Sequence, residues 1–110
     1  MSLKARCPDH VPLLEALGDS YTKLGFYEEG LAIDLQLTGR DSANPTYWYN
    51  LACSYARLQQ SADALAALER GVELGYDDAG WMMADEDLAS IRQCPEFLKL
   101  VSRLSAKQPA

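Results

Sequence analysis

Large apolar residues recur along this chain at intervals of three and four positions, with polar residues between them. Because successive residues of a helix are turned by about 100°, this spacing gathers the apolar side chains on one side of a helix. No segment alternates apolar and polar residues over a useful length, as a half-buried strand would. The pattern predicts an all-α fold whose main helices cover residues 11–23, 27–38, 45–58 and 61–74.

Residues with known preferences for helix ends support these boundaries. Asn44 directly before Pro45 is the expected pair of N-cap and first helical residue, and Asp9 is a suitable N-cap for the first helix. Glycines follow three of the predicted helices, where the chain has to turn. These glycines are Gly25, Gly39 and Gly75.

The first two helix pairs are related by a shift of 34 residues. A constant period of this length indicates one supersecondary unit that is repeated. The single domain 1–110 therefore divides into repeat 1 (11–44), repeat 2 (45–78) and a third part (79–106). The shift aligns Leu14 with Trp48, Leu17 with Leu51, Gly18 with Ala52, Tyr21 with Tyr55, Gly30 with Ala64 and Leu31 with Leu65.

These aligned residues resemble the signature of the tetratricopeptide repeat (TPR) family. Repeat 2 carries Trp48-x-x-Leu51-Ala52-x-x-Tyr55 and then Ala64-x-x-x-Leu68, and repeat 1 carries Leu14-x-x-Leu17-Gly18-x-x-Tyr21. The resemblance implies an α-solenoid of antiparallel helix pairs, coiled into a right-handed superhelix, of the short bacterial type. Its small residues let helices approach closely, and we expect Trp48, Tyr21 and Tyr55 to lie in the core. Asp34 departs from the family pattern, which usually has an aromatic or apolar residue there.

Residues 79–106 do not form a full repeat, because Asp85 and Glu86 stand where the repeat needs apolar and small residues. The stretch 85–97 instead resembles the short helix, turn and final helix that close many bacterial TPR arrays. A terminal repeat needs such a cap, since its apolar face would otherwise lie in water. The apolar residues expected to cover repeat 2 are Leu88, Ile91, Phe97, Leu98, Val101 and Leu104. At the other end, residues 3–7 are either the stub of a preceding helix or a short tail.

Composition narrows the classes of partner and compartment. The formal net charge of −6 and the pI of about 4.6 disfavour nucleic acid, whose phosphates require clustered Lys and Arg. No apolar run approaches the ~18 residues of a membrane span, and residues 1–15 lack a signal-peptide core. We therefore expect no membrane contact and a cytoplasmic location. Cys7, Cys53 and Cys94 form no Cys-x-x-Cys pair and are expected to be free thiols.

Two groups of residues have the chemistry of reactive or metal-binding sites. Cys7 and His10 lie three apart, but no orienting group or oxyanion donor accompanies them. The acidic residues between 77 and 87 lack the spacing of a calcium loop and are explained better by helix capping. The sequence predicts no catalytic residue, metal or cofactor, and no enzymatic activity.

The functional prediction concerns the side of each repeat's first helix that faces away from the apolar stripe. In relatives of the TPR type this side lines a concave groove that holds an extended peptide or a partner helix. Tyr49 is the expected anchor, since aromatic residues and Arg concentrate binding energy at interfaces. The candidate partner-binding residues are Glu15, Asp19, Thr22, Lys23, Tyr49, Asn50, Cys53 and Arg57.

The best-known binding site of the TPR family is a clamp of Lys, Asn and Arg that holds the C-terminal carboxylate of a partner. Comparison with this clamp tests which kind of partner the groove would accept. Asn50 matches that clamp, whereas Glu15, Asp19, Gly80 and Ala84 replace the other positions. Carboxylates in the groove would repel an acidic tail, so a neutral or basic segment is favoured. The predicted function is a protein-interaction module. The alternative is a structural or self-associating unit, either a homo-oligomer or part of a longer array.

Overall fold

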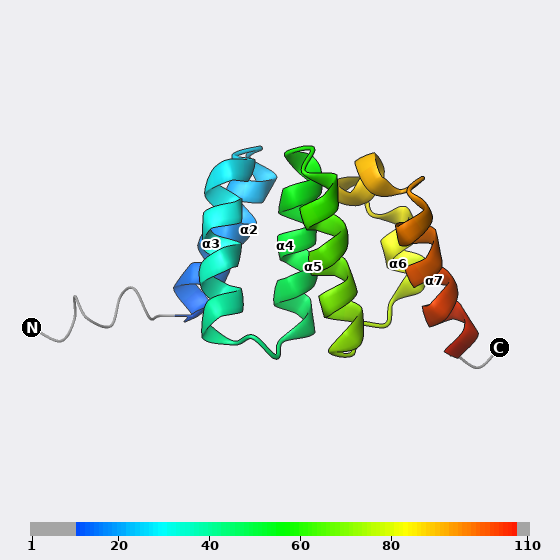
Figure 1. The fold of residues 1–110 in the computed structure, drawn as a ribbon. Coiled ribbons are helices and arrows are strands. Elements are labelled where there is room, and N and C mark those ends of the chain that lie inside the picture. Colours follow the sequence, from blue (N-terminus) through cyan, green and yellow to red (C-terminus); the bar gives the residue numbers. More distant parts are fainter. Residues whose placement is uncertain (1–10, 108–110) are drawn as a thin grey trace, which may run out of the picture.

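In the computed structural model, which describes residues 11–107, the chain is all-helical and no strand occurs within that range. α2 packs on α3, α3 on α4 and α4 on α5, and α2 and α7 lie at opposite ends of the molecule (Figure 1). The elements are α2 (Val11–Lys23), α3 (Tyr27–Arg40), α4 (Pro45–Arg57), α5 (Ser61–Glu73), α6 (Ala79–Ala84), the 3-10 helix η2 (Glu86–Ile91) and α7 (Pro95–Lys107).

The predicted boundaries of the four main helices are confirmed to within two residues. The Asn44 side chain caps α4 by accepting from the backbone N–H of Thr46 at 3.0 Å and of Tyr47 at 3.4 Å. Gly39 does not end its helix, because α3 continues through it to Arg40. The predicted cap at Asp9, and the question of residues 3–7, lie outside the described residues.

The turn that ends α2 is repeated, bond for bond, at the end of α4. Phe26 N–H donates to the carbonyl of Tyr21 at 2.8 Å, and 34 positions later Gln60 N–H donates to that of Tyr55 at 2.9 Å. Each is the longer of the two hydrogen bonds of a Schellman motif, in which the residue just before the N–H donor takes a positive φ. Gly25 has φ 84°, and Gln59, the residue 34 positions on, has φ 63° although it is not glycine. The sequence period is thus matched by a repeated backbone conformation.

Small residues set the spacing between neighbouring helices. A side chain at Gly71 of α5 would lie 3.3 Å from the carbonyl oxygen of Pro45, and one at Gly18 would lie 3.2 Å from the Ile33 methyl group. The predicted aromatic core is only partly correct. Trp48, Tyr21 and Tyr55 pack against the buried clusters but remain partly exposed. Trp48 lies at an edge because its indole N–H donates to the Ser42 carbonyl at 2.9 Å.

The elements that follow α5 pack back on α4 and α5: η2 contacts both helices, and α7 contacts α5. Leu88, Ile91 and Phe97 are fully buried, Leu104 is buried, and Val101 is partly buried. The assignment of Leu98 to this core is wrong, since 45% of it is exposed. Positions 97, 100, 101 and 104 lie on the same side of α7 over about two turns, so Leu100 is buried there and Leu98 is not.

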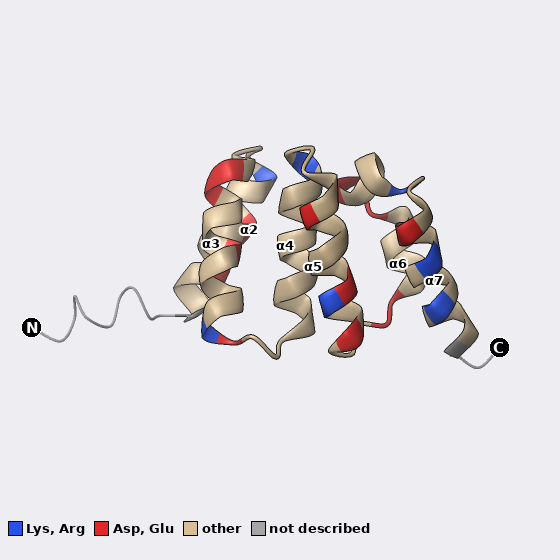
Figure 2. Cartoon of the chain, in the orientation of Figure 1, with Lys and Arg blue, Asp and Glu red and all other residues tan. Residues whose placement is uncertain are grey.

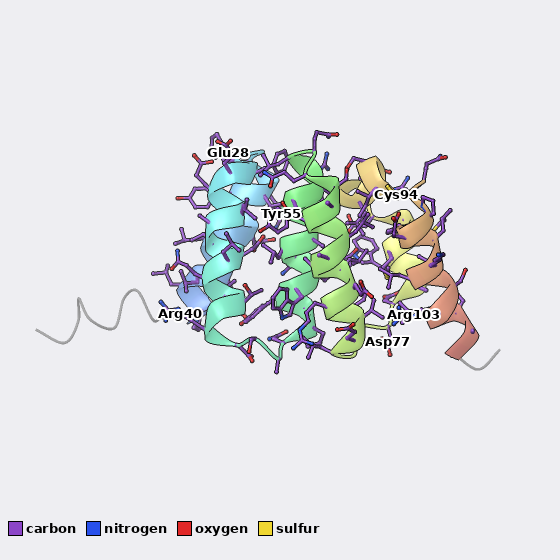
Figure 3. The ribbon with its side chains drawn as sticks, viewed as in Figure 1. Glu28, Arg40, Tyr55, Asp77, Cys94 and Arg103 are labelled. Atoms are coloured by element: carbon purple, nitrogen blue, oxygen red, sulfur yellow. The ribbon has the colours of Figure 1, made fainter. Side chains whose placement is uncertain are left out.

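Charged side chains are distributed to match the helix dipoles. Lys or Arg occupies the last turn of each of the helices α2 to α5, and Glu28 and Glu29 occupy the first turn of α3 (Figure 2). Glu28 and Arg40 accordingly mark the two ends of α3 (Figure 3). None of the described helices is long and apolar enough to cross a bilayer.

Candidate functional site

A groove of about 360 Å³ runs across α2, α4 and α6, with its walls completed by α3 and the start of η2. The sequence predicted that residues from repeats 1 and 2 would meet on one face. The structure brings six of those eight candidates together in this groove. They are Glu15, Asp19, Thr22, Tyr49, Asn50 and Cys53.

The two remaining candidates, Lys23 and Arg57, do not line the groove. Lys23 forms an exposed ion pair with Asp19, with 3.0 Å between Nζ and Oδ2. Arg57 forms an ion pair of 2.8 Å with Asp87, and its guanidinium lies 5.3 Å from the centre of the Tyr27 ring. Both cations neutralise carboxylates at the rim of the groove.

Tyr49 and Cys53 line the groove but are not the exposed contacts that the sequence predicted. Tyr49 is only 5% exposed, and Cys53 is also buried. The Tyr49 hydroxyl donates to Asp85 Oδ2 at 2.6 Å, and its ring stacks on Tyr76 with 4.3 Å between centroids. The expectation failed because the third part of the chain folds over α4 instead of leaving this side of the helix open.

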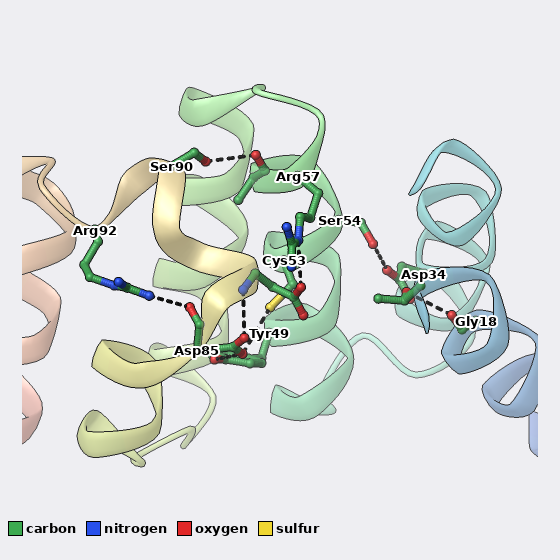
Figure 4. Close-up of polar contacts among 12 residues, drawn as sticks. Gly18, Asp34, Tyr49, Cys53, Ser54, Arg57, Asp85, Ser90 and Arg92 are labelled. Carbon is green, nitrogen blue, oxygen red and sulfur yellow. Dashed lines mark hydrogen bonds and ion pairs between the residues drawn. The ribbon is translucent and has the colours of Figure 1, made fainter. Parts of the chain in front are cut away.

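Hydrogen bonds around Asp85 and Ser90 hold that third part in place (Figure 4). Besides the Tyr49 bond, Ser90 Oγ donates to the Ala56 carbonyl and Arg92 donates to the Asp85 carbonyl, each at 2.9 Å. Asp85 Oδ1 also accepts from the Asp87 N–H at 2.9 Å and so caps η2. Asp85 thus joins the third part to α4 through Tyr49, which explains an acidic residue at a position where the repeat needs an apolar one.

The Cys53 Sγ and carboxylate oxygens of Asp85 and Asp87 lie within 4.8 Å of one another. Burial, followed by the charge of Asp85, raises the pKa of the Cys53 thiol well above its usual range. Cys53 therefore stays protonated and directs its S–H at Asp85 Oδ2, at 3.8 Å. Hydrogen bonding within the protein accounts for this cluster.

Asp34 links α3 to α4 in the wall of the groove. It is buried on α3, and its Oδ2 accepts a hydrogen bond of 2.6 Å from the Ser54 hydroxyl of α4. Burial raises the pKa of Asp34 from its usual 3.8 to about 6, and the Ser54 bond partly opposes that rise. Asp34 departed from the family pattern in the sequence, which was the available signal of a special role.

We expect the stability of the chain to depend on pH through Asp34. Because its pKa is higher in the folded state, the folded chain binds more protons than the unfolded chain between pH 3.8 and about 6. The contribution of Asp34 to stability is therefore most favourable below that range and falls as pH rises through about 6. Asp34→Asn should remove this fall, so that its stability relative to wild type rises by about 1 to 2 kcal/mol between pH 5 and pH 8.

Urea unfolding at the two pH values would measure this effect. Ser54→Ala is the matched control. Loss of the donor should raise the pKa of Asp34 further, so the stability of this variant should fall more between pH 5 and pH 8 than that of wild type. Equal pH profiles for wild type and Asp34→Asn would contradict the prediction.

Several groove residues were not identified from sequence. Tyr47 is buried, and its hydroxyl donates to Glu15 Oε2 at 2.5 Å, connecting α4 to α2. Trp81 also lines the groove and is exposed, as is Thr46, which the helix pattern had placed on the outward side of the first helix of repeat 2. The spacing within each repeat gave no signal for Trp81, because α6 belongs to the part of the chain that departs from the repeat. Cys7 and His10 lie outside the described residues.

The groove is acidic. Among the residues that the structure describes, its lining contains five carboxylates and no Lys, Arg or His. The carboxylates come from four parts of the fold: α2, α3, η2 and the residue that precedes η2. They are Glu15, Asp19, Asp34, Asp85 and Asp87.

No protein-family model and no solved structure matches the chain. The chain is similar to a protein of Arabidopsis thaliana whose name describes it as chloroplastic, with 33% identity over 92 residues. The match covers 78% of this chain but only 27% of the Arabidopsis protein. The chain thus corresponds to about a quarter of that relative's length, and the relative's name states a compartment but no activity.

Proposed function

We propose that the chain is a short TPR-type α-solenoid that binds a protein segment, a peptide or a partner helix, in its groove. In this proposal, α2 with α3 and α4 with α5 are antiparallel pairs of a right-handed superhelix, and the third part is its cap. The Schellman turns repeated after 34 residues and the close helix contacts at Gly18 and Gly71 support this assignment. The module has no enzymatic role and needs no cofactor.

The observation that carries the function is the convergence of six predicted residues on one groove. Asn50 and Thr46 are exposed there and offer hydrogen bonds, while the buried Tyr49 and Tyr47 hold the surrounding helices through bonds to carboxylates. An interaction site needs such a combination of accessible polar groups on a rigid support. A cytoplasmic location is part of the same proposal, whereas the name of the Arabidopsis relative assigns that protein to the chloroplast.

Panning a random peptide library displayed on phage against the folded chain would test the binding function. We expect peptides to be enriched, and Asn50→Trp to weaken the best of them about tenfold or more by filling the groove. Gln36→Trp, at an exposed position of α3 outside the groove, is the matched control and should bind normally. Equal binding by both variants would contradict the location of the site.

Self-association is the second candidate function, and the distribution of exposed apolar residues favours it. Four of the seven exposed large hydrophobic residues in the described part of the chain lie in α2, α3 or their connecting turn: Leu13, Leu24, Phe26 and Leu35. The other end of the molecule is covered by the cap. Light scattering on a size-exclusion column distinguishes the two functions, because a peptide-binding monomer keeps one mass at all concentrations whereas a stacking unit does not.

A further inference from the structure

We infer that the groove recognises a basic segment, specifically an Arg side chain placed between the carboxylates of α2 and the exposed indole of Trp81. This inference rests on the proposed function and specifies the chemistry of the partner. It depends on two observations that are independent of each other: the unbalanced charge of the groove and the exposed aromatic residue on its far wall.

Two of the five groove carboxylates are available to a partner. Asp85 is buried and accepts hydrogen bonds on both oxygens, Asp34 is buried against Ser54, and Asp87 is paired with Arg57. Glu15 and Asp19 are exposed and lie one turn apart on α2, so their side chains project to the same side.

The existing partners of these two residues leave them capable of binding. The ion pair between Asp19 and Lys23 is exposed on both sides, and such pairs contribute little free energy. A partner guanidinium can therefore replace Lys23 at small cost. Glu15 accepts one bond from Tyr47 through Oε2, which fixes the carboxylate and leaves Oε1 for a second donor.

Trp81 supplies the opposite wall. It is 52% exposed, and it projects from α6, whose start is fixed by the Asp78 side chain accepting from the Trp81 N–H at 2.9 Å. A guanidinium stacks on an indole face and forms paired hydrogen bonds with a carboxylate, whereas an ammonium ion does each less well. A groove with carboxylates at one side and an indole at the other thus favours Arg over Lys.

The groove also discriminates against acidic and purely apolar segments. An acidic side chain would meet five carboxylates, of which only Asp19 and Asp87 are paired with cations, Lys23 and Arg57 at the rim. An apolar segment would desolvate Glu15 and Asp19 without offering them any further donor, which is costly. Basic residues are therefore the one charged class that this lining attracts.

The peptides enriched on wild type by panning provide the probe. We expect them to contain Arg in excess over the starting library, and the affinity of a synthetic copy of the strongest peptide to fall with salt. Glu15→Gln with Asp19→Asn should weaken that peptide about tenfold or more, and Trp81→Ala should weaken it by about fivefold or more. Isothermal titration calorimetry would measure these changes.

Two matched controls separate a local site from general attraction to an acidic protein. Glu28→Gln with Glu29→Gln removes the same number of negative charges outside the groove, and Phe26→Ala removes an aromatic residue that is also 52% exposed. Both controls should bind like wild type.

The outcomes distinguish this inference from the proposed function. The basic partner would be overturned if the enriched peptides lack Arg and bind the Glu15 and Asp19 variant as well as wild type. If the same peptides still lose affinity for Asn50→Trp, the binding function remains intact. Basic peptides weakened equally by the Glu28 and Glu29 changes would overturn the site and indicate general charge attraction. If no peptide is enriched above background, both proposals fail.

Discussion

A chain that ends after Asp78 should aggregate or remain unfolded. The deletion removes α6, η2 and α7, and with them Met82, Leu88, Ile91, Phe97, Leu100 and Leu104, all of which are buried. Each such side chain contributes about 1.5 to 3 kcal/mol on burial, so the six together are worth about as much as the roughly 5 to 15 kcal/mol that stabilises a typical small domain. The deletion also exposes the buried Leu68 of α5 and leaves Tyr49 without its acceptor. Size-exclusion chromatography and thermal melting followed by circular dichroism would measure the loss.

Two neighbouring residues of α7 provide the control for this deletion. Phe97→Ala should lower stability by about 3 to 5 kcal/mol, because its ring is fully buried. Leu98→Ala should change stability far less, by about 0.5 kcal/mol, because Leu98 is 45% exposed and lies outside the buried core. A soluble fragment of residues 1–78 that unfolds cooperatively would show that the third part is not a structural cap.

Local features were predictable because they depend on neighbouring residues. The start of α4 follows from Asn44 and Pro45, which supply a side-chain acceptor and a preset φ within one turn. The same holds for the turn after α2, where Gly25 adopts a positive φ. Such signals lie entirely within a few positions of the chain, and tertiary contacts did not override them here.

The exposure of the groove residues was not predictable in the same way. Tyr49 meets Asp85 across 36 positions, and Ser54 meets Asp34 across 20. The repeat pattern orients Tyr49 correctly, away from the apolar stripe, but it contains no information about a segment that does not follow the pattern. Asp85 was recognised as an exception, yet its partner depends on the path of residues 75–85, which periodicity does not determine.

The assignment of Leu98 failed for a different reason. Apolar residues of α7 occupy positions 97, 98, 100, 101 and 104, which is wider than one side of a helix. Periodicity restricts the buried side to a few alternatives, and the shape of the surface beneath α7 selects among them. Leu100 is buried and Leu98 is not, a choice that only the packing against α5 and α6 makes.

Tyr49→Ala should be among the most destabilising single substitutions outside the cap. It empties a buried aromatic site, at about 3 to 5 kcal/mol, and removes the stacking partner of Tyr76. It also leaves Asp85 Oδ2 with the weak Cys53 donor alone, an added cost of about 1 to 3 kcal/mol. Chemical unfolding of the variant, compared with wild type, would measure the sum as a lower unfolding midpoint.

Tyr49→Phe separates these two contributions, since it keeps the ring and removes only the hydroxyl. It should cost about 1 to 3 kcal/mol, as expected for a buried carboxylate that loses its strongest donor. Burial, followed by the bond to Asp85, raises the pKa of Tyr49, so the wild-type hydroxyl remains a donor throughout the neutral range and this cost should not vary there. Asn50→Ala, at the next and exposed position of α4, should leave the midpoint nearly unchanged. If Tyr49→Phe unfolds at the wild-type midpoint, the bond to Asp85 does not hold the cap on α4, and burial of the apolar residues alone must do so.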